Sequence, residues 1–286
     1  MVTFFVGSTR KILVRSSNKK PLASEVVVHS GLARYHRRAM SDIAEILARF
    51  QRRDRRALAE ILSRVENGEL LPAPVVAGAA QGKPTHVVGI TGSGGAGKST
   101  LVGALVEHVR GLGLTVGVLA CDPQSPVTGG ALLGDRIRVR FDPADEGVYF
   151  RSMSTRGAAG GISAATGAAR DWLQAFGFDL ILIETVGVGQ DQVAVRALVD
   201  TLALLVTPNT GDEVQWEKAG LIEVADLIVV NKSDLPGADR VRQQLTSALS
   251  LGPHGTQPPV LNVTAATGKG VPELWQAICA RSAAPR

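Results

Sequence analysis

The chain has 286 residues and a formal net charge of +5, with 45% hydrophobic and 20% charged residues. This composition is typical of a folded globular protein and excludes an intrinsically disordered one. Residues 1–40 carry eight Lys or Arg and one acid, whereas the rest of the chain carries 23 basic and 25 acidic residues. The excess positive charge therefore lies outside the main body, which argues against nucleic acid as a partner.

The first 40 residues form a basic leader without sustained periodicity, for which several interpretations stay open. Its richness in Ser, Arg and Lys overlaps with organellar transit peptides, which would direct the protein to the mitochondrial matrix. Alternatively, Met40 is the natural start, because a good helix start follows at Ser41-Asp42, and the leader is then non-essential. A third possibility is an interaction tail.

Residues 41–84 are predicted to be a short N-terminal helical segment followed by a linker. Apolar residues recur at helical spacing from Ser41 to about Asn67, and Gly68 then marks a stop. Residues 69–84 contain three prolines and two glycines, which is typical of a linker.

Residues 85–286 are predicted to be one α/β domain, because short apolar runs alternate with helical patterns. Runs without polar alternation fit strands buried on both faces, so we expect a mostly parallel sheet between two helical layers. The predicted strands cover residues 86–90, 115–121, 147–151, 179–184, 202–207, 226–231 and 260–264. The predicted helices lie near 98–111, 162–176, 190–200, 214–223, 237–250 and 271–281.

A phosphate-binding loop of the form G-x-x-x-x-G-K-[ST] follows the first of these strands. Its glycines let successive N–H groups converge on phosphate oxygens, and the next helix adds the partial positive charge of its N-terminus. Lys98 would contact the β- and γ-phosphates, and Ser99 would offer its hydroxyl to Mg²⁺. We therefore predict a P-loop NTPase fold, with nucleotide bound by Gly92, Ser93, Gly94, Gly95, Ala96, Gly97, Lys98, Ser99 and Thr100.

A second motif, N-K-S-D at residues 231–234, is the guanine signature N-K-x-D and ends an apolar strand. The carboxylate of Asp234 can accept hydrogen bonds from N1–H and the exocyclic amino group of guanine, a donor pair that adenine lacks. Asn231 would bind near the base, and the stem of Lys232 would pack on its face. After the last predicted strand, Thr264, Ala265 and Ala266 are placed to offer a backbone contact to the guanine oxygen.

Acidic residues near strand ends are the candidates for Mg²⁺ binding and catalysis. Glu184 ends an apolar strand in the Walker B arrangement, and the loop 185–190 after it has the glycines that a nucleotide-sensing switch requires. Asp122 ends the second strand and Asp135 lies in a glycine-rich turn, where each would bind Mg²⁺, orient water or merely cap a helix.

Four stretches together resemble the MeaB/ArgK family of P-loop GTPases of the SIMIBI class. They read GITGSGGAGKST, ACDPQSPVTGGALLGDRIRV, ILIETVGVGQ and TPNTGDEVQWEKAGLIEVADLIVVNKSD, and the resemblance runs from about Ala44 to Cys279. Members of this family are chaperones of adenosylcobalamin-dependent acyl-CoA mutases such as methylmalonyl-CoA mutase. The resemblance thus implies such a mutase as partner, with its adenosylcobalamin, and a cobalamin adenosyltransferase as a further candidate partner.

The resemblance also implies roles for individual residues. Lys98, Asp122, Asp135, Glu184 and Gln190 would be catalytic, and four oxygen donors would surround Mg²⁺: Ser99, Asp122, Asp135 and Glu184. Loop 185–190 would be switch II. Residues 211–220 look like a third switch that reports nucleotide state to the mutase, with Gly211, Asp212, Glu213, Gln215 and Lys218 as its contacts.

Two departures from the family pattern limit what is carried over. Trp216, Glu217 and Ala219 differ from the residues expected around Lys218, which would retune the partner contact. The chain also ends soon after the helix predicted at 271–281, where relatives continue into a dimerisation arm, so a homodimer stays open.

The expected function is a Mg²⁺-dependent GTPase that gates cofactor loading and protection of an acyl-CoA mutase. No arginine finger is evident, although Arg136 and Arg156 lie in candidate loops, so intrinsic hydrolysis should be slow. An ATP-dependent small-molecule kinase, a metallocentre-assembly GTPase and a non-hydrolysing scaffold are the alternatives. N-K-S-D argues against ATP, and the lack of a Cys/His cluster argues against metal delivery. With two distant cysteines and no run of 18 apolar residues, we expect a cytoplasmic protein without a membrane partner.

Overall fold

The computed structural model describes residues 42–69, 85–122, 142, 144–154, 164–185, 195–208, 221–250 and 257–282. The chain divides into two units, Met1–Arg52 and Arg53–Arg286. In the first unit, residues 42–51 are helical, in agreement with the predicted helix start. Among the described residues, no helix is both long and apolar enough to cross a bilayer.

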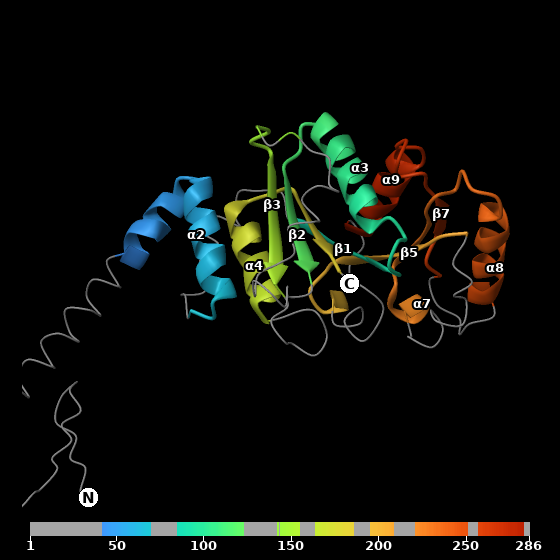
Figure 1. Ribbon diagram of the computed structural model, residues 1–286, viewed down its shortest axis with the longest axis horizontal. Coiled ribbons are helices and arrows are strands. Elements are labelled where there is room, and N and C mark those ends of the chain that lie inside the picture. Colours follow the sequence, from blue (N-terminus) through green and yellow to red (C-terminus); the bar gives the residue numbers. More distant parts are fainter. Residues whose placement is uncertain are drawn as a thin grey trace, which may run out of the picture. The chain divides into compact units, whose positions relative to one another are not determined.

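Seven parallel strands form the sheet of the second unit (Figure 1). Their order is β3-β2-β4-β1-β5-β6-β7, and every neighbouring pair is parallel. The strands are β1 (His86–Gly92), β2 (Val116–Asp122), β3 (Val148–Ser154), β4 (Leu180–Glu184), β5 (Thr201–Val206), β6 (Leu227–Val230) and β7 (Val260–Asn262). The predicted α/β class is confirmed, and each predicted strand is present within a few residues of its expected bounds.

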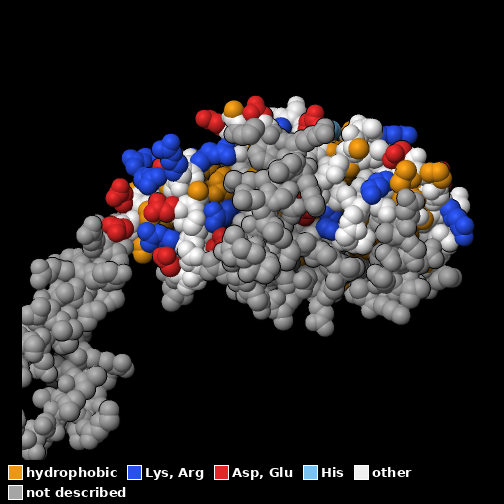
Figure 2. Space-filling model, viewed as in Figure 1, with side chains coloured by type: hydrophobic (Ala, Val, Ile, Leu, Met, Phe, Trp, Pro, Cys, Tyr) orange, Lys and Arg blue, Asp and Glu red, His pale blue; other side chains and the backbone are white. Residues whose placement is uncertain are grey.

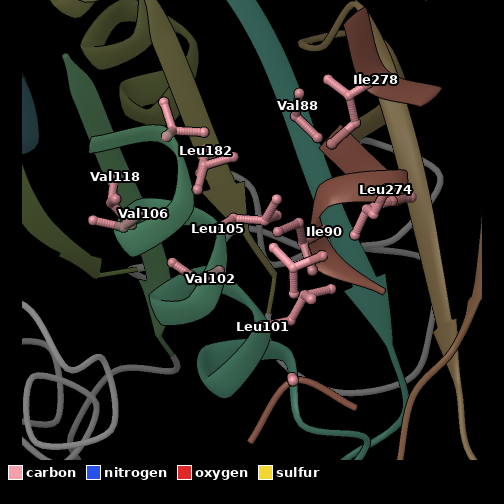
Figure 3. Packing of buried hydrophobic residues seen from close by; sticks show 14 of the residues in the cluster. Val88, Ile90, Leu101, Val102, Leu105, Val106, Val118, Leu182, Leu274 and Ile278 are labelled. Carbon is pink, nitrogen blue, oxygen red and sulfur yellow. The ribbon is translucent and has the colours of Figure 1, made fainter. Parts of the chain in front are cut away.

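Helices cover both faces of the sheet because its apolar side chains alternate between them. Val88, Ile90 and Leu182 share one core cluster with residues of α3 (Lys98–Gly111) and α9 (Val271–Ser282), as Figure 3 shows. On the opposite face, Leu204 and Val206 of β5 pack with α8 (Ala238–Ser250). At Gly117 of β2, a Cβ atom would lie 3.4 Å from Leu173 of α4 (Ala164–Phe176), so α4 covers that opposite face too.

Helix α2 (Arg55–Glu66) packs against α4 and reaches the edge strand β3. It starts at Asp54, whose carboxylate accepts the Arg56 N–H at 2.8 Å. Arg55 donates to the carbonyls of Glu146 and Val148 at that edge. Because an open strand edge exposes unpaired carbonyls, Arg55 protects the edge of the sheet. Figure 2 shows basic and acidic side chains interspersed over the surface that α2 forms.

Three aspartates fix the register at the end of the sheet where the strands begin. Asp200 precedes β5; its carboxylate accepts the Val87 N–H at 2.8 Å, and its own N–H donates to the Val87 carbonyl at 2.8 Å. The same two-way exchange joins Asp226 before β6 to Leu202, and Asp179 before β4 to Thr115. In each case, the aspartate before one strand bonds to the start of the neighbouring strand through both its carboxylate and its backbone N–H.

A bidentate ion pair joins the last turn of α3 to the segment that precedes β3. Arg110 of α3 contacts both carboxylate oxygens of Asp145, at 2.8 and 2.9 Å. This bond, together with the Gly147 N–H, holds the pKa of the Asp145 carboxyl below its usual range, and Asp145 in turn raises the pKa of Arg110. A Cβ atom at Gly147 would lie 2.1 Å from the Arg110 guanidinium, so a larger residue there would displace the end of that side chain and disturb the ion pair.

Two predicted helices lie partly outside the described residues. Of the helix predicted near 190–200, residues 190–194 are not described, and residues 195–198 form a short turn before β5. Of the helix predicted near 214–223, the structure shows α7 (Leu221–Val224). The domain boundary predicted at residue 85 stays a prediction.

Candidate functional site

The phosphate-binding loop joins the carboxyl end of β1 to α3, in the middle of the sheet. Gly92 has a φ of 146°, and a Cβ atom there would lie 2.4 Å from the Leu205 carbonyl oxygen. Gly97, with a φ of 91°, takes the left-handed conformation at the N-cap of α3. Both positions therefore require glycine, because any other residue would be strained or would collide.

Lys98 lies in the first turn of α3 and folds back across this loop. Its Nζ donates to the carbonyls of Gly92 at 2.8 Å and Ser93 at 2.9 Å, and the residue is 8% exposed. An ammonium group and a helix N-terminus thus meet at one loop. Together they form a concentrated site of positive potential, of the kind that binds phosphate.

Ser99 and Glu184 bring two oxygen donors together beside the loop. Strands β1 and β4 are neighbours with Ile90 opposite Glu184, which places the glutamate next to the start of α3. Ser99 Oγ donates to Glu184 Oε1 at 2.6 Å, and Glu184 is buried. Hydroxyl and carboxylate oxygens are the hard ligands that suit Mg²⁺ in a phosphate site, so the pair fits that ion.

The N-K-S-D segment contacts the phosphate-binding loop directly. Asn231 is 2% exposed, and its Nδ2 donates to the Ala96 carbonyl at 2.8 Å. Lys232 has a φ of 56°, and its Nζ donates to the Gly95 carbonyl at 2.9 Å. Asp234 is exposed at the same edge of the sheet. These contacts place a residue set suited to a base beside one suited to phosphates.

The loop after β7 completes this edge. Asn231 Oδ1 accepts the Ala265 N–H at 3.1 Å, so one asparagine side chain joins three loops. Ala266 is the exposed residue next to it, and Thr264 is buried. Of the three residues predicted to contact the guanine oxygen, Ala265 therefore donates its N–H to another residue of the protein, and Ala266 is the exposed one.

Several predicted site residues lie outside the described part of the chain. Asp122 ends β2, two residues beyond Ala120, whose register partner is Glu184; its backbone is thus at the expected edge, but its side chain is not described. The remaining predictions fall on undescribed residues: Asp135, Arg136, Arg156, Gln190, Gly211, Asp212, Glu213, Gln215, Trp216, Glu217, Lys218 and Ala219.

Sequence reasoning missed two hydroxyl pairs at this edge. Thr185 Oγ1 lies 3.1 Å from Thr91 Oγ1, and both residues are buried where β4 gives way to loop 185–190. Ser233 Oγ lies 2.9 Å from Thr264 Oγ1. Strand pairing creates both contacts, so the sequence offered no local signal for either.

A metallocentre-assembly GTPase, one of the alternatives above, would need a cluster of metal-binding side chains. Within those residues, no three His, Cys, Asp or Glu side chains are grouped so that they could hold a metal ion. His86 instead lies at the start of β1, with its Nε2 3.0 Å from Thr201 Oγ1.

The family description "Methylmalonyl Co-A mutase-associated GTPase MeaB" matches residues 63–284. The chain belongs to the MeaB family. A candidate GTPase of Pyrococcus horikoshii is 52% identical over 198 residues, covering 68% of this chain and 62% of that protein. The mouse mitochondrial methylmalonic aciduria type A homolog is 42% identical over 202 residues, covering 68% of this chain and 49% of that protein. The GTPase ArgK of Escherichia coli is 40% identical over 197 residues, covering 67% of this chain and 60% of that protein.

This chain therefore spans roughly half to three fifths of the length of the curated MeaB-family relatives that it matches. Among solved structures, an LAO/AO transport system kinase superposes with a TM-score of 0.63 at 28% identity. That match covers 85% of this chain and 75% of the other. The comparison confirms the predicted P-loop NTPase-like architecture.

Proposed function

We propose that this protein binds GTP and hydrolyses it to GDP and phosphate, and that it thereby acts as a chaperone of an adenosylcobalamin-dependent acyl-CoA mutase. The observation that carries the nucleotide part is the contact of Asn231 and Lys232 with the phosphate-binding loop, at 2.8 and 2.9 Å. Guanine recognition and phosphate binding would thus be built as one unit.

Guanine would be selected by Asp234, whose exposed carboxylate would accept from N1–H and the exocyclic amino group. Adenine offers no such donor pair, so bound ATP would leave the acceptor unsatisfied, a cost of about 1 to 3 kcal/mol or more for a charged group. This supports GTP over the ATP of a small-molecule kinase.

Hydrolysis would rest on positioning and charge rather than on covalent chemistry. Lys98 and the N-terminus of α3 would neutralise charge on the β- and γ-phosphates. Ser99 and Glu184 would hold Mg²⁺, with Asp122 and Asp135 as further proposed donors, and the ion would neutralise charge on the phosphate oxygens. Gln190 would orient the attacking water. Release of Lys98 from the Gly92 and Ser93 carbonyls would accompany nucleotide binding.

The partner would be methylmalonyl-CoA mutase or a close relative, as the family description supports. Loop 185–190 and residues 211–220 would transmit the nucleotide state to the mutase. By linkage, a partner that favours one nucleotide state must itself be bound more tightly in that state. Nucleotide would in this way gate cofactor loading and protection, and a cobalamin adenosyltransferase would be a further partner.

Two measurements test the proposal. Equilibrium binding of GTP and ATP to the purified chain should show a clear preference for GTP, and an ATP preference would refute the base assignment. GTP turnover should then rise on addition of a cognate mutase. If none of several mutases stimulates turnover or forms a complex, the chaperone role is refuted, although GTP binding would still stand.

A further inference from the structure

Ser233, the variable third position of the N-K-x-D segment, bonds to the loop after β7 through both its backbone and its side chain. Its N–H donates to the Val263 carbonyl at 3.1 Å. Its hydroxyl oxygen lies 2.9 Å from the hydroxyl oxygen of Thr264, and the pair is partly buried. A hydroxyl pair at this distance is a good hydrogen bond, whichever oxygen donates.

Thr264 in turn organises the loop that it starts. Its N–H donates to the Lys269 carbonyl at 2.9 Å, and its carbonyl accepts from the Thr267 N–H at 3.0 Å and the Thr267 hydroxyl at 3.2 Å. With its backbone held at both ends and only 5% exposed, Thr264 is a rigid point of the loop. A bond to its side chain therefore acts on the whole turn.

The turn carries the two residues that follow. Ala265 gives its N–H to Asn231, and Ala266 is exposed beside the N-K-S-D segment. The position of Ala266 relative to Asp234 thus depends on three links between the loops: the Asn231 side chain to Ala265, the Ser233 backbone to Val263, and the Ser233 side chain to Thr264.

We infer that Ser233 is a positioning residue for guanine, which fixes the loop of Ala266 so that its backbone N–H meets the base oxygen. The inference rests on the proposed GTP binding. The hydroxyl does not touch the nucleotide. It holds the loop in place before the ligand binds, which reduces the conformational entropy that is lost on binding. The loop serves the base oxygen O6, which guanine and hypoxanthine share and adenine replaces with an amino donor.

The test compares GTP, ITP and ATP binding to wild type, Ser233→Ala and Ser233→Thr. Ser247→Ala, at an exposed position of α8, is the matched control. Loss of one hydrogen bond should weaken GTP and ITP equally, by about threefold to tenfold. ATP binding should not change, and turnover at saturating GTP should stay at the wild-type rate. Ser233→Thr, which keeps the hydroxyl, should restore most of the GTP affinity.

Equal weakening of all three nucleotides would show a general structural defect and overturn the inference, as would unchanged GTP affinity in Ser233→Ala. Thr264→Val supplies an independent route, because it removes the partner hydroxyl at similar volume. The double variant should then be no weaker than the worse single variant, whereas additive losses would show that the hydroxyls act separately. If the wild type fails to prefer GTP over ATP, the proposed function itself falls and this inference with it.

Discussion

A Cβ atom added at Gly97 would lie 2.5 Å from Nδ2 of Asn231. The phosphate-binding loop and the N-K-S-D segment are thus in contact at a point where only glycine fits, and the same Nδ2 donates to the Ala96 carbonyl at 2.8 Å. A side chain at position 97 would push Asn231 away from Ala96 and break the link between the two loops.

Three glycine substitutions in one loop separate this contact from backbone strain. Gly97→Ala introduces both the contact with Asn231 and backbone strain, and it should lower the free energy of unfolding by about 2 to 4 kcal/mol. Gly95 has a φ of 76° but open space where a Cβ would lie, so in Gly95→Ala strain alone should lower the free energy of unfolding by about 1 to 2 kcal/mol. Gly94→Ala has neither problem and should be neutral or slightly stabilising. Denaturant unfolding without nucleotide measures all three variants, and equal losses at positions 95 and 97 would contradict the contact.

Removal of the Glu184 carboxylate should uncouple GTP binding from hydrolysis. Glu184→Gln keeps the shape but not the charge beside Ser99, so turnover should fall at least about tenfold and need more Mg²⁺. GTP affinity should change much less, because the loop amides and Lys98 remain. Glu223→Gln, an exposed glutamate of α7, is the control. Turnover measured against Mg²⁺ concentration checks this, and identical curves for wild type and Glu184→Gln would exclude a metal-binding role.

Arg55 should contribute to stability far more than its neighbour Arg56. Arg55 bonds to two carbonyls at the β3 edge, and its guanidinium lies 5.6 Å from the ring centre of Tyr149. Arg55→Ala should lower the free energy of unfolding by about 1 to 3 kcal/mol. Arg56 is exposed, so Arg56→Ala should change it by less than about 0.5 kcal/mol. Equal effects would mean that Arg55 is not protecting the edge.

The Arg110–Asp145 pair should make stability depend on acidic pH. Because the pKa of Asp145 is lowered on folding, its contribution is present above the unfolded pKa of about 3.9 and is lost as pH falls through the folded value. At neutral pH, Asp145→Asn should cost about 1 kcal/mol, since both side chains are partly exposed and screened. The gap between variant and wild type should close in strong acid. Denaturant unfolding from pH 7 to pH 2 tests this, and a gap independent of pH would exclude an ionic contribution.

Features encoded by neighbouring residues could be predicted from the sequence. The apolar runs that became β1, β4 and β5 are buried on both faces, so their pattern alone indicated central parallel strands. The phosphate-binding loop was equally clear, because glycines, lysine and serine must follow one another in it.

Features created by pairing between distant strands could not be predicted. Ser233 meets Thr264 only because β6 and β7 pair with Val230 opposite Asn262, a register that no local pattern specifies. The same holds for Arg55, which looked like one more surface charge on an amphipathic helix. Its role depends on α2 reaching the β3 edge, some ninety residues further along the chain.

The aspartate exchanges at Asp179, Asp200 and Asp226 lie at the opposite end of the sheet from the phosphate-binding loop and the N-K-S-D segment. They set strand register at the end remote from the nucleotide residues, using bonds that do not involve the carboxyl-end loops. Loops at the nucleotide end can therefore change length or sequence without letting the strands slip. Exchange of such a loop with a relative should transfer its partner preference while the stability of the scaffold stays as it was, which makes this sheet a suitable frame for swapping recognition loops.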